Sequence, residues 1–376
     1  MDFDFSPEEQ QLKDQARRYL ADHCPSSAVR AVLDGPQSHD AALWRGLGEQ
    51  GYLGAALPEH LGGSAAGYGA LCVIAEELGR AVAPVPFSSS IALAAELLLR
   101  AGTPDQQQRW LPRLAAGQAV GTLALAERAG RVTPAAIACT ATRGRLHGSK
   151  RPVADGDIAD FAVVATRDGG AATLSLQLVD LAGTGVQRSV LPGIDPTRSQ
   201  AQLDFDGAQA EPLGAPGEGW ALLREAQDRA AVLMAFEQVG GADRALQAAC
   251  DYAQERFAFG RPIGGLQAIK HMLADMYVSV TLARSNAYYG AWALGSGAPE
   301  LAEAAATARV SATQAYLHCA RNNIQVHGGM GFTWAFDCHL HYRRANALAL
   351  ALGSASEWED RLVDRLVDRR VSRRAA

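Results

Sequence analysis

This sequence of 376 residues lacks a basic excess and any long apolar run. The formal net charge of −5 leaves no surplus of cations to neutralise phosphates, which argues against nucleic acid as a partner. The longest apolar stretch, residues 91–99, contains Glu96 and is too short to cross a bilayer, so we expect no membrane insertion. The first residues show no basic stretch followed by an apolar one, and we therefore expect a cytoplasmic protein.

Several local motifs of enzymes are also missing. The cysteines show no CxxC spacing, which predicts reduced and mostly buried thiols. There is no phosphate-binding P-loop and no evident Ser-His-Asp arrangement. The pair His339 and His341 has no third metal ligand nearby in sequence, which favours a structural role over a metal site. The six cysteines are Cys24, Cys72, Cys139, Cys250, Cys319 and Cys338.

What is present falls into three compositional zones, and we predict three domains over residues 1–118, 119–214 and 215–376. The first zone is helical in pattern. Its opening Ser6-Pro7-Glu8-Glu9 is a capping box with proline at the first helical position. Further periodic stretches follow at residues 41–48, 69–78 and 90–99, separated by Pro and Gly clusters.

The middle zone has the period-two pattern of strands. Leu174, Leu176 and Leu178 alternate with Ser175, Gln177 and Val179. Residues 161–166 form a short apolar run, and residues 202–206 alternate again before Gly207. These features predict a small antiparallel β domain.

The third zone returns to long helices, expected at residues 219–257, 266–294 and 299–325. A last helix starts near Ser354 or Ser356, each of which has a glutamate three residues later. Strands and helices do not alternate along the chain, so the fold class is α+β and not a doubly wound sheet.

Four segments resemble the signatures of acyl-CoA dehydrogenases, and they occur in the family's order along essentially the whole chain. Near the N-terminus they are Asp4-Phe-Ser-Pro-Glu-Glu and residues 51–63. Near the C-terminus they are Glu255-Arg-Phe-Ala-Phe-Gly-Arg-Pro-Ile263, followed by Leu266-Gln267, and Gln325-Val-His-Gly-Gly-Met-Gly-Phe332. Each segment alone is a weak signal, whereas four in register are a strong one.

The resemblance implies a helical N-terminal domain, a middle antiparallel β domain and a C-terminal four-helix bundle. It also implies a tetrameric flavoprotein that uses FAD to remove two hydrogens from Cα and Cβ of an acyl-CoA thioester. Electrons would pass to an electron-transfer flavoprotein or a similar acceptor. In this family the flavin lies at a subunit interface, where one chain surrounds the ring and its neighbour clamps the pyrophosphate and adenine.

The clamp half of that arrangement has matching residues in this sequence. Arg256 matches the arginine set against the pyrophosphate, a task that suits the planar fork of a guanidinium. Phe259 and Gln267 match further cofactor contacts. Gln325 with Gly328 and Gly329 matches the loop near the adenine, where glycine lets the backbone approach a ligand.

The catalytic half departs from the family. The two positions where the family places its proton-abstracting glutamate are occupied by Leu352 and Ala230, neither of which can accept a proton. Asp228 and Glu237 are near the second position in sequence, and we expect both on a solvated helix face.

The two segments that flank the flavin ring in the family are altered as well. In residues 126–132, Ala126 replaces the threonine that would touch the flavin. In residues 152–155, the family's Trp-Ile-Thr-Asn run becomes Pro-Val-Ala-Asp. Two hydroxyl donors to the ring are therefore missing from this chain.

The main hypothesis is a subunit of a heteromeric acyl-CoA dehydrogenase whose paralogous partner supplies the glutamate, acting on bulky acyl-CoA esters such as those of steroid side-chain degradation. A self-sufficient flavoenzyme with oxygenase or desulfinase chemistry is one alternative. A non-catalytic acyl-CoA-binding or structural subunit is another, and an ordinary homotetrameric dehydrogenase with its base elsewhere is a third.

Overall fold

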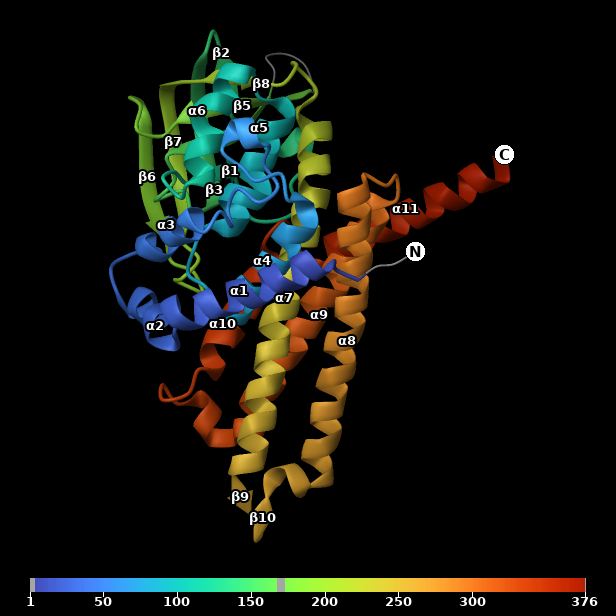
Figure 1. The fold of residues 1–376 in the computed structure, drawn as a ribbon. Helices are drawn as coiled ribbons and strands as arrows, with labels where there is room; N and C mark the ends of the chain where they lie inside the picture. The colour runs from blue at the N-terminus through green and yellow to red at the C-terminus, as the bar shows by residue number, and fades with distance from the viewer. Residues whose placement is uncertain (1–3, 168–172, 376) are drawn as a thin grey trace. The chain divides into compact units, whose positions relative to one another are not determined.

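The computed structural model describes residues 4–167 and 173–375, with side chains up to residue 367, and it divides into two compact units. The first unit contains Met1–Val29, Tyr68–Ala83 and Ala231–Ala376, and the second contains Arg30–Gly67 and Pro84–Ala230. The long helix α7 (Gly219–Glu255) begins in the second unit and ends in the first (Figure 1).

The first unit is a helical bundle in which α9 (Leu301–His327) runs alongside α8 (Gln267–Ser296). Both α7 and α9 are rich in alanine, which has the highest helix propensity and allows close packing of helix on helix. Neither helix has one dominant apolar face, because most of their length is buried on all sides. The remaining helices of this unit are α1 (Pro7–His23), α4 (Gly67–Arg80), α10 (Cys338–Leu350) and α11 (Ala355–Ala375).

Two buried carboxylates on α4 tie the helices of the first unit together. Glu76 accepts from Lys13 of α1 at 2.6 Å and lies 3.3 Å from Arg284 of α8. Glu77 accepts from Arg17 of α1 at 2.8 Å. Because unpaired buried charge is costly, these carboxylates fix α4 against its cationic neighbours.

The second unit is built on an eight-stranded sheet. Most neighbours are antiparallel, but β4 pairs in parallel with both β1 and β2, so the expected antiparallel domain is in fact a mixed sheet. The strands are β1 (Gly121–Ala124), β2 (Thr140–Thr142), β3 (Arg145–Ala154), β4 (Phe161–Arg167), β5 (Leu174–Asp180), β6 (Val186–Leu191), β7 (Gln200–Gln209) and β8 (Glu211–Leu213).

Some helices in the described part of the chain were not expected from the sequence pattern. In the second unit this is α6 (Pro104–Ala115), and in the first unit it is α10. The third is α2 (Ser26–Asp34), which begins in the first unit and ends in the second. The stretch expected as one helix at residues 90–99 is a π-helix over Ser88–Ala95 continued by α5 (Glu96–Ala101). Shorter elements are α3 (Ala41–Glu49), η1 (Glu59–Leu61) and η3 (Pro134–Ala136).

The capping motifs read from the sequence are present. Ser6 and Glu9 exchange side-chain and backbone hydrogen bonds at the start of α1. Ser354 does the same with Glu357, so the last helix begins after Ser354 and not after Ser356. Across the described residues, we find no helix both long and apolar enough to cross a membrane.

Candidate functional site

The first candidate region is the far end of the bundle, where α7 gives way to a short hairpin of β9 (Phe257–Ala258) and β10 (Arg261–Pro262), seen at the tip of the bundle in Figure 1. Arg256 lies at the junction. Its N–H donates to the Tyr252 carbonyl at 2.9 Å, and its carbonyl accepts from the Ile263 N–H at 2.8 Å. The backbone of Arg256 is thus held on both sides while its side chain is exposed.

Phe259 occupies the turn of this hairpin, together with Gly260. Both residues have positive φ, +54° and +75°, as the tight turns of two-residue hairpins require. Phenylalanine is a poor choice for this conformation, which Asn and Gly adopt at lower cost. The ring is also 91% exposed. The backbone is thus strained at a residue that presents its aromatic ring to solvent.

The second part of this region is the end of α9. Gln325 is exposed, and Gly328 ends the helix with a φ of +60° that favours glycine. A Cβ built on Gly328 or Gly329 would meet no heavy atom within 4 Å, so the space over this turn is open. By contrast, a Cβ on Gly331 would approach the Ile324 carbonyl to 2.7 Å, which makes that glycine a packing requirement.

Aromatic stacking brings these two parts to the same end of the first unit. The rings of Tyr252 on α7 and His327 on α9 are stacked with centroids 4.1 Å apart, and Phe336 packs edge-on against both. Burial lowers the pKa of His327, which favours the neutral ring in the stack. Gln267 is the first residue of α8, separated by Leu266 from η4 (Ile263–Gly265), which follows the hairpin. The six predicted cofactor contacts therefore gather at one end of the bundle, all exposed: Arg256, Phe259, Gln267, Gln325, Gly328 and Gly329.

These residues suit the phosphate and adenine end of a dinucleotide. An exposed guanidinium offers paired donors to phosphate oxygens, the exposed Phe259 ring offers a stacking surface, and the open Gly328 turn leaves room for a ligand. The fit rests on the exposure of these groups and on the space over the glycines.

The turn that holds Leu352 is supported by buried hydrogen-bond donors. Arg309, which is 1% exposed, donates to the carbonyls of Leu348 and Ala351, the second at 2.6 Å. The indole of Trp358 donates to the Leu352 carbonyl at 3.2 Å. Leu352 itself has a φ of +63° and packs against the core of the bundle. The turn is well defined, yet the side chain that it presents is inert.

The second base position is equally unable to act, because Ala230 is fully buried inside α7. The expectation that Asp228 and Glu237 lie on a solvated face is wrong, since they are 6% and 1% exposed. The central part of α7 is enclosed on all sides, and Glu237 lies 3.5 Å from the buried guanidinium of Arg344. This ion pair gives Glu237 a structural role. The sequence could not predict the pair, because Arg344 lies 107 residues away along the chain.

In the second unit, the two segments expected around the flavin ring do lie together. The N–H of Arg151, the residue before the second segment, donates to the Ala126 carbonyl in the first segment at 2.7 Å. The buried ammonium of Lys150 donates to Glu127 at 2.8 Å, and Glu127 also accepts the N–H groups of Ala138 and Cys139. Burial opposes ionisation of Glu127, but these donors outweigh it and lower its pKa.

The backbone of the two segments is therefore held together, but the positions expected to donate to a flavin ring are alanines. Ala126 is half-buried and Ala154 is exposed, and each presents a methyl group where a hydroxyl would be needed. The backbone of Ala154 is fixed by the Thr122 hydroxyl, which donates to its carbonyl at 2.6 Å. This half fits a flavin ring less well than the bundle end fits a pyrophosphate.

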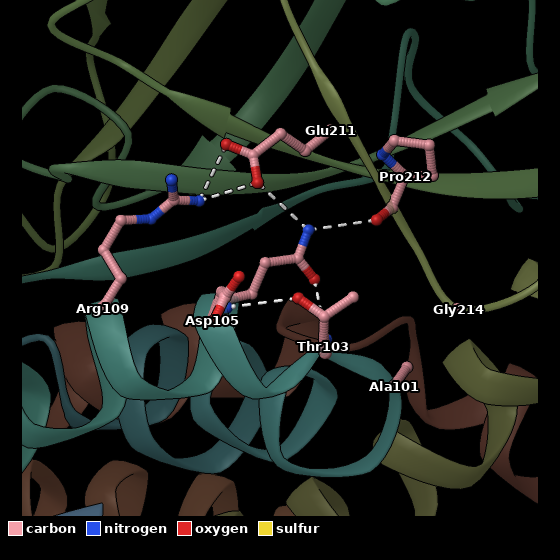
Figure 2. A pocket seen from close by; sticks show the side chains of 9 residues that line it. Ala101, Thr103, Asp105, Arg109, Glu211, Pro212 and Gly214 are labelled. Carbon is pink, nitrogen blue, oxygen red and sulfur yellow. Dashed lines mark hydrogen bonds and ion pairs between the residues drawn. The ribbon is translucent and has the colours of Figure 1, made fainter.

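A separate hollow in the second unit, shown in Figure 2, is polar but its groups satisfy one another. Arg109 reaches both carboxylate oxygens of Glu211 at 2.8 and 2.9 Å. Gln106 donates to Glu211 and to the Pro212 carbonyl. These contacts bind α6 to β8, so the hollow is a helix–strand joint and no candidate for catalysis.

The histidine pair does not converge on a common point. His341 is buried, with Nδ1 3.1 Å from the Tyr316 hydroxyl, whereas the His339 ring stacks on Trp334. Among the described residues, no group of three or more His, Cys, Asp or Glu side chains is placed to hold a metal ion. The six cysteines are free thiols, all but the half-buried Cys250 fully buried.

Comparison with known protein families identifies the family of this chain. Residues 6–118 match the acyl-CoA dehydrogenase N-terminal domain, and residues 217–365 match the acyl-CoA dehydrogenase C-terminal domain. The chain belongs to the acyl-CoA dehydrogenase family. A curated relative, acyl-CoA dehydrogenase IpdE2 of Mycobacterium tuberculosis, is 37% identical over 95% of this chain and 96% of its own length.

Solved structures of acyl-CoA dehydrogenases agree with this family assignment. A chain of a Tcur3481-Tcur3483 steroid ACAD variant superposes with a TM-score of 0.87 at 32% identity, covering 97% of this chain and 99% of that one. A chain of the ChsE4-ChsE5 complex from Mycobacterium tuberculosis gives 0.88 at 28% identity, covering 98% and 99%. Both relatives are named as pairs of two different chains.

Proposed function

We propose that this chain is the non-base subunit of a heteromeric, FAD-dependent acyl-CoA dehydrogenase. The observation that carries the proposal is the contrast within the chain. The bundle end keeps an exposed Arg256, a strained and exposed Phe259 and an open Gly328 turn. The positions that would act on the substrate hold Leu352 and Ala230, which have no titratable group.

The relatives support a two-chain assembly and a bulky substrate. Two solved relatives are named as paired chains, and one of these is described as a steroid acyl-CoA dehydrogenase. By analogy, the substrate of the complex would be a large acyl-CoA thioester, such as one derived from a steroid. An electron-transfer flavoprotein or a similar carrier would remove the electrons.

In this assembly the chain's own task is binding. Arg256 would hold the pyrophosphate of the FAD seated in the partner, Phe259 and Gln267 would contact the rest of the nucleotide, and the turn after Gln325 would leave room for the adenine. Bound FAD would accept the hydride equivalent from Cβ of the substrate. The α-proton has no acceptor at the family's positions in this chain, so the partner would supply the carboxylate.

Arg256→Ala in the assembled complex tests the proposal. The guanidinium makes charge-assisted hydrogen bonds worth about 1.5–3 kcal/mol each, so we expect flavin affinity to fall by roughly 10- to 100-fold. Arg261→Ala is the matched control, because it removes an exposed arginine from the same hairpin. Flavin content and turnover that are unchanged by Arg256→Ala would refute the proposal.

A further inference from the structure

The turn that follows β3 in the second unit is closed around a buried carboxylate. Asp155 comes directly after Ala154, the last residue of β3, and is only 4% exposed. Its φ of +54° lies in the left-handed region, which aspartate adopts more readily than most side chains. The Asp155 N–H donates to the Ser199 carbonyl at 2.9 Å, and the Asp155 carbonyl accepts the Ala159 N–H at 3.0 Å. Residues 155–159 thus form a turn with hydrogen bonds that report on its closure.

Neighbouring side chains enclose the Asp155 carboxylate. Ser89, near the start of the π-helix, donates to one carboxylate oxygen at 2.6 Å, and the Ser199 hydroxyl lies 3.4 Å from the other. The guanidinium of Arg198 donates to the Ser88 hydroxyl at 3.0 Å. Ser89 and Arg198 are 3% and 8% exposed, so the carboxylate has buried polar groups around it in place of bulk water. We call these five residues the Asp155 cluster.

The charges that face Asp155 come from its own turn and from two other segments. Burial raises the pKa of Asp155, because the enclosed carboxylate loses its water. The Arg198 guanidinium and the Ser89 hydroxyl oppose this rise in pKa. The carboxylate of Asp157 adds to the rise, whereas His39 opposes it more weakly. Burial lowers the pKa of His39, which leaves that ring neutral at pH 7.

We infer that Asp155 makes the closure of turn 155–159 depend on pH, with the turn held more firmly when the carboxylate is protonated than when it is ionised. In the closed turn the ionised carboxylate exchanges water for buried hydroxyls and a guanidinium, whereas in an open turn it is hydrated. Ionisation therefore favours opening. Opening would free the backbone beside Ala154, one of the positions expected to flank a flavin ring. The Asp155 cluster needs neither flavin nor a partner chain, so this behaviour does not depend on the proposed function.

Hydrogen exchange of the amides in turn 155–159 tests this inference in the full chain, with the amides of β4 as the reference for the second unit. After correction for intrinsic exchange, protection of the turn should be highest near pH 4. It should fall by up to about tenfold per pH unit as the pH rises, and level off above the pKa of the closed turn. Asp155→Asn keeps the size of the side chain but cannot ionise, so its protection should not change with pH. Asp206→Asn, which removes an exposed carboxylate from β7, is the control and should retain the fall.

Ser89→Ala gives a second measure, which decides the question if circular dichroism shows that Asp155→Asn is not folded. It removes the hydroxyl that donates to the ionised carboxylate, so protection of the turn at pH 7 should drop by about tenfold or more, and near pH 4 by a smaller factor. Protection that does not change with pH in the parent protein would overturn the inference, as would a fall that persists in Asp155→Asn. An equal loss at both pH values in Ser89→Ala would overturn it too, because the hydroxyl would then contribute only packing.

Discussion

The bundle end and the Leu352 turn are both held by buried contacts, yet only the bundle end presents polar and aromatic side chains suited to binding a ligand. At the bundle end, the Tyr252–His327 stack holds Arg256 near an open glycine turn. At the Leu352 turn, Arg309 and Trp358 donate hydrogen bonds to the backbone carbonyls of Ala351 and Leu352. The turn is firmly held although the side chain that it presents has no titratable group.

A turn can therefore be firmly held whether or not the side chain that it presents is reactive. The two segments of the second unit that are expected to flank a flavin ring show the same contrast. The Arg151 N–H joins them by its hydrogen bond to Ala126, but Ala126 and Ala154 have no hydroxyl. A subunit that serves a partner's flavin would experience selection of this kind. It must fold like its catalytic relatives and bind at the bundle end, but it need not abstract a proton.

Arg309→Met should have the largest effect on folding. It leaves the carbonyls of Leu348 and Ala351 and the amide of Gln238 without their buried donor, so we expect a loss of about 3 kcal/mol or more in the free energy of unfolding. Arg321→Met, at an exposed position of the same helix, is the control. Denaturant unfolding measures the free energy of unfolding of both variants. Equal values would show that Arg309 does not hold the turn at Leu352.

His341 should give the bundle core a pH dependence. Burial, followed by the nearby guanidinium of Arg244, lowers the pKa of His341 to about 3 in the folded protein. The unfolded chain binds a proton near pH 6.5 and the folded chain does not, so stability is full above that pH and falls as the pH is lowered toward 3. Between pH 7 and 5 this group alone should cost roughly 2 kcal/mol.

His341→Gln checks that prediction, because it removes the titrating ring and should flatten this part of the stability profile. His271→Gln, which removes an exposed imidazole from α8, should leave the fall in stability as it is in the parent protein. Urea unfolding at a series of pH values compares the three proteins. A slope as steep in His341→Gln as in the parent protein would assign the effect to another group.

The double substitution Ala126→Thr and Ala154→Thr should have the smallest of these effects. It changes the two segments that are expected to flank the flavin ring. Each restored hydroxyl can donate one hydrogen bond, worth about 1 kcal/mol, so flavin binding by this chain should tighten roughly fivefold per substitution. Ala138→Thr, an exposed position near the same loop, is the control. Flavin titration followed by fluorescence measures affinity, and no gain would mean that these positions do not face the ring.

Local signals in the sequence predicted much of the fold. The capping boxes at Ser6 and Ser354 located helix starts, and the alternation at residues 174–179 located β5. That strand is nevertheless buried on both faces, including the polar Ser175 and Gln177, which the alternation did not indicate. Helix α6 was missed although Thr103, Pro104 and Gln106 form a capping box that could have revealed it.

Long-range pairings were beyond reach from one sequence. The burial of Glu237 depends on Arg344, and that of Glu76 depends on Lys13 and Arg284. The candidate cofactor residues came from the family signatures. What the sequence could not supply was the strained backbone of Phe259 and the Tyr252–His327 stack that draws two distant segments to one end of the bundle.

The central claim, that this chain completes a flavin site held by another, is tested most directly by flavin content per chain. We expect little or no flavin in the chain purified alone. We expect about one FAD for every two chains after co-expression with a glutamate-bearing paralogue, since one partner would seat the cofactor and the other would clamp it. One FAD per chain in the protein purified alone would contradict the account and favour a self-sufficient flavoenzyme.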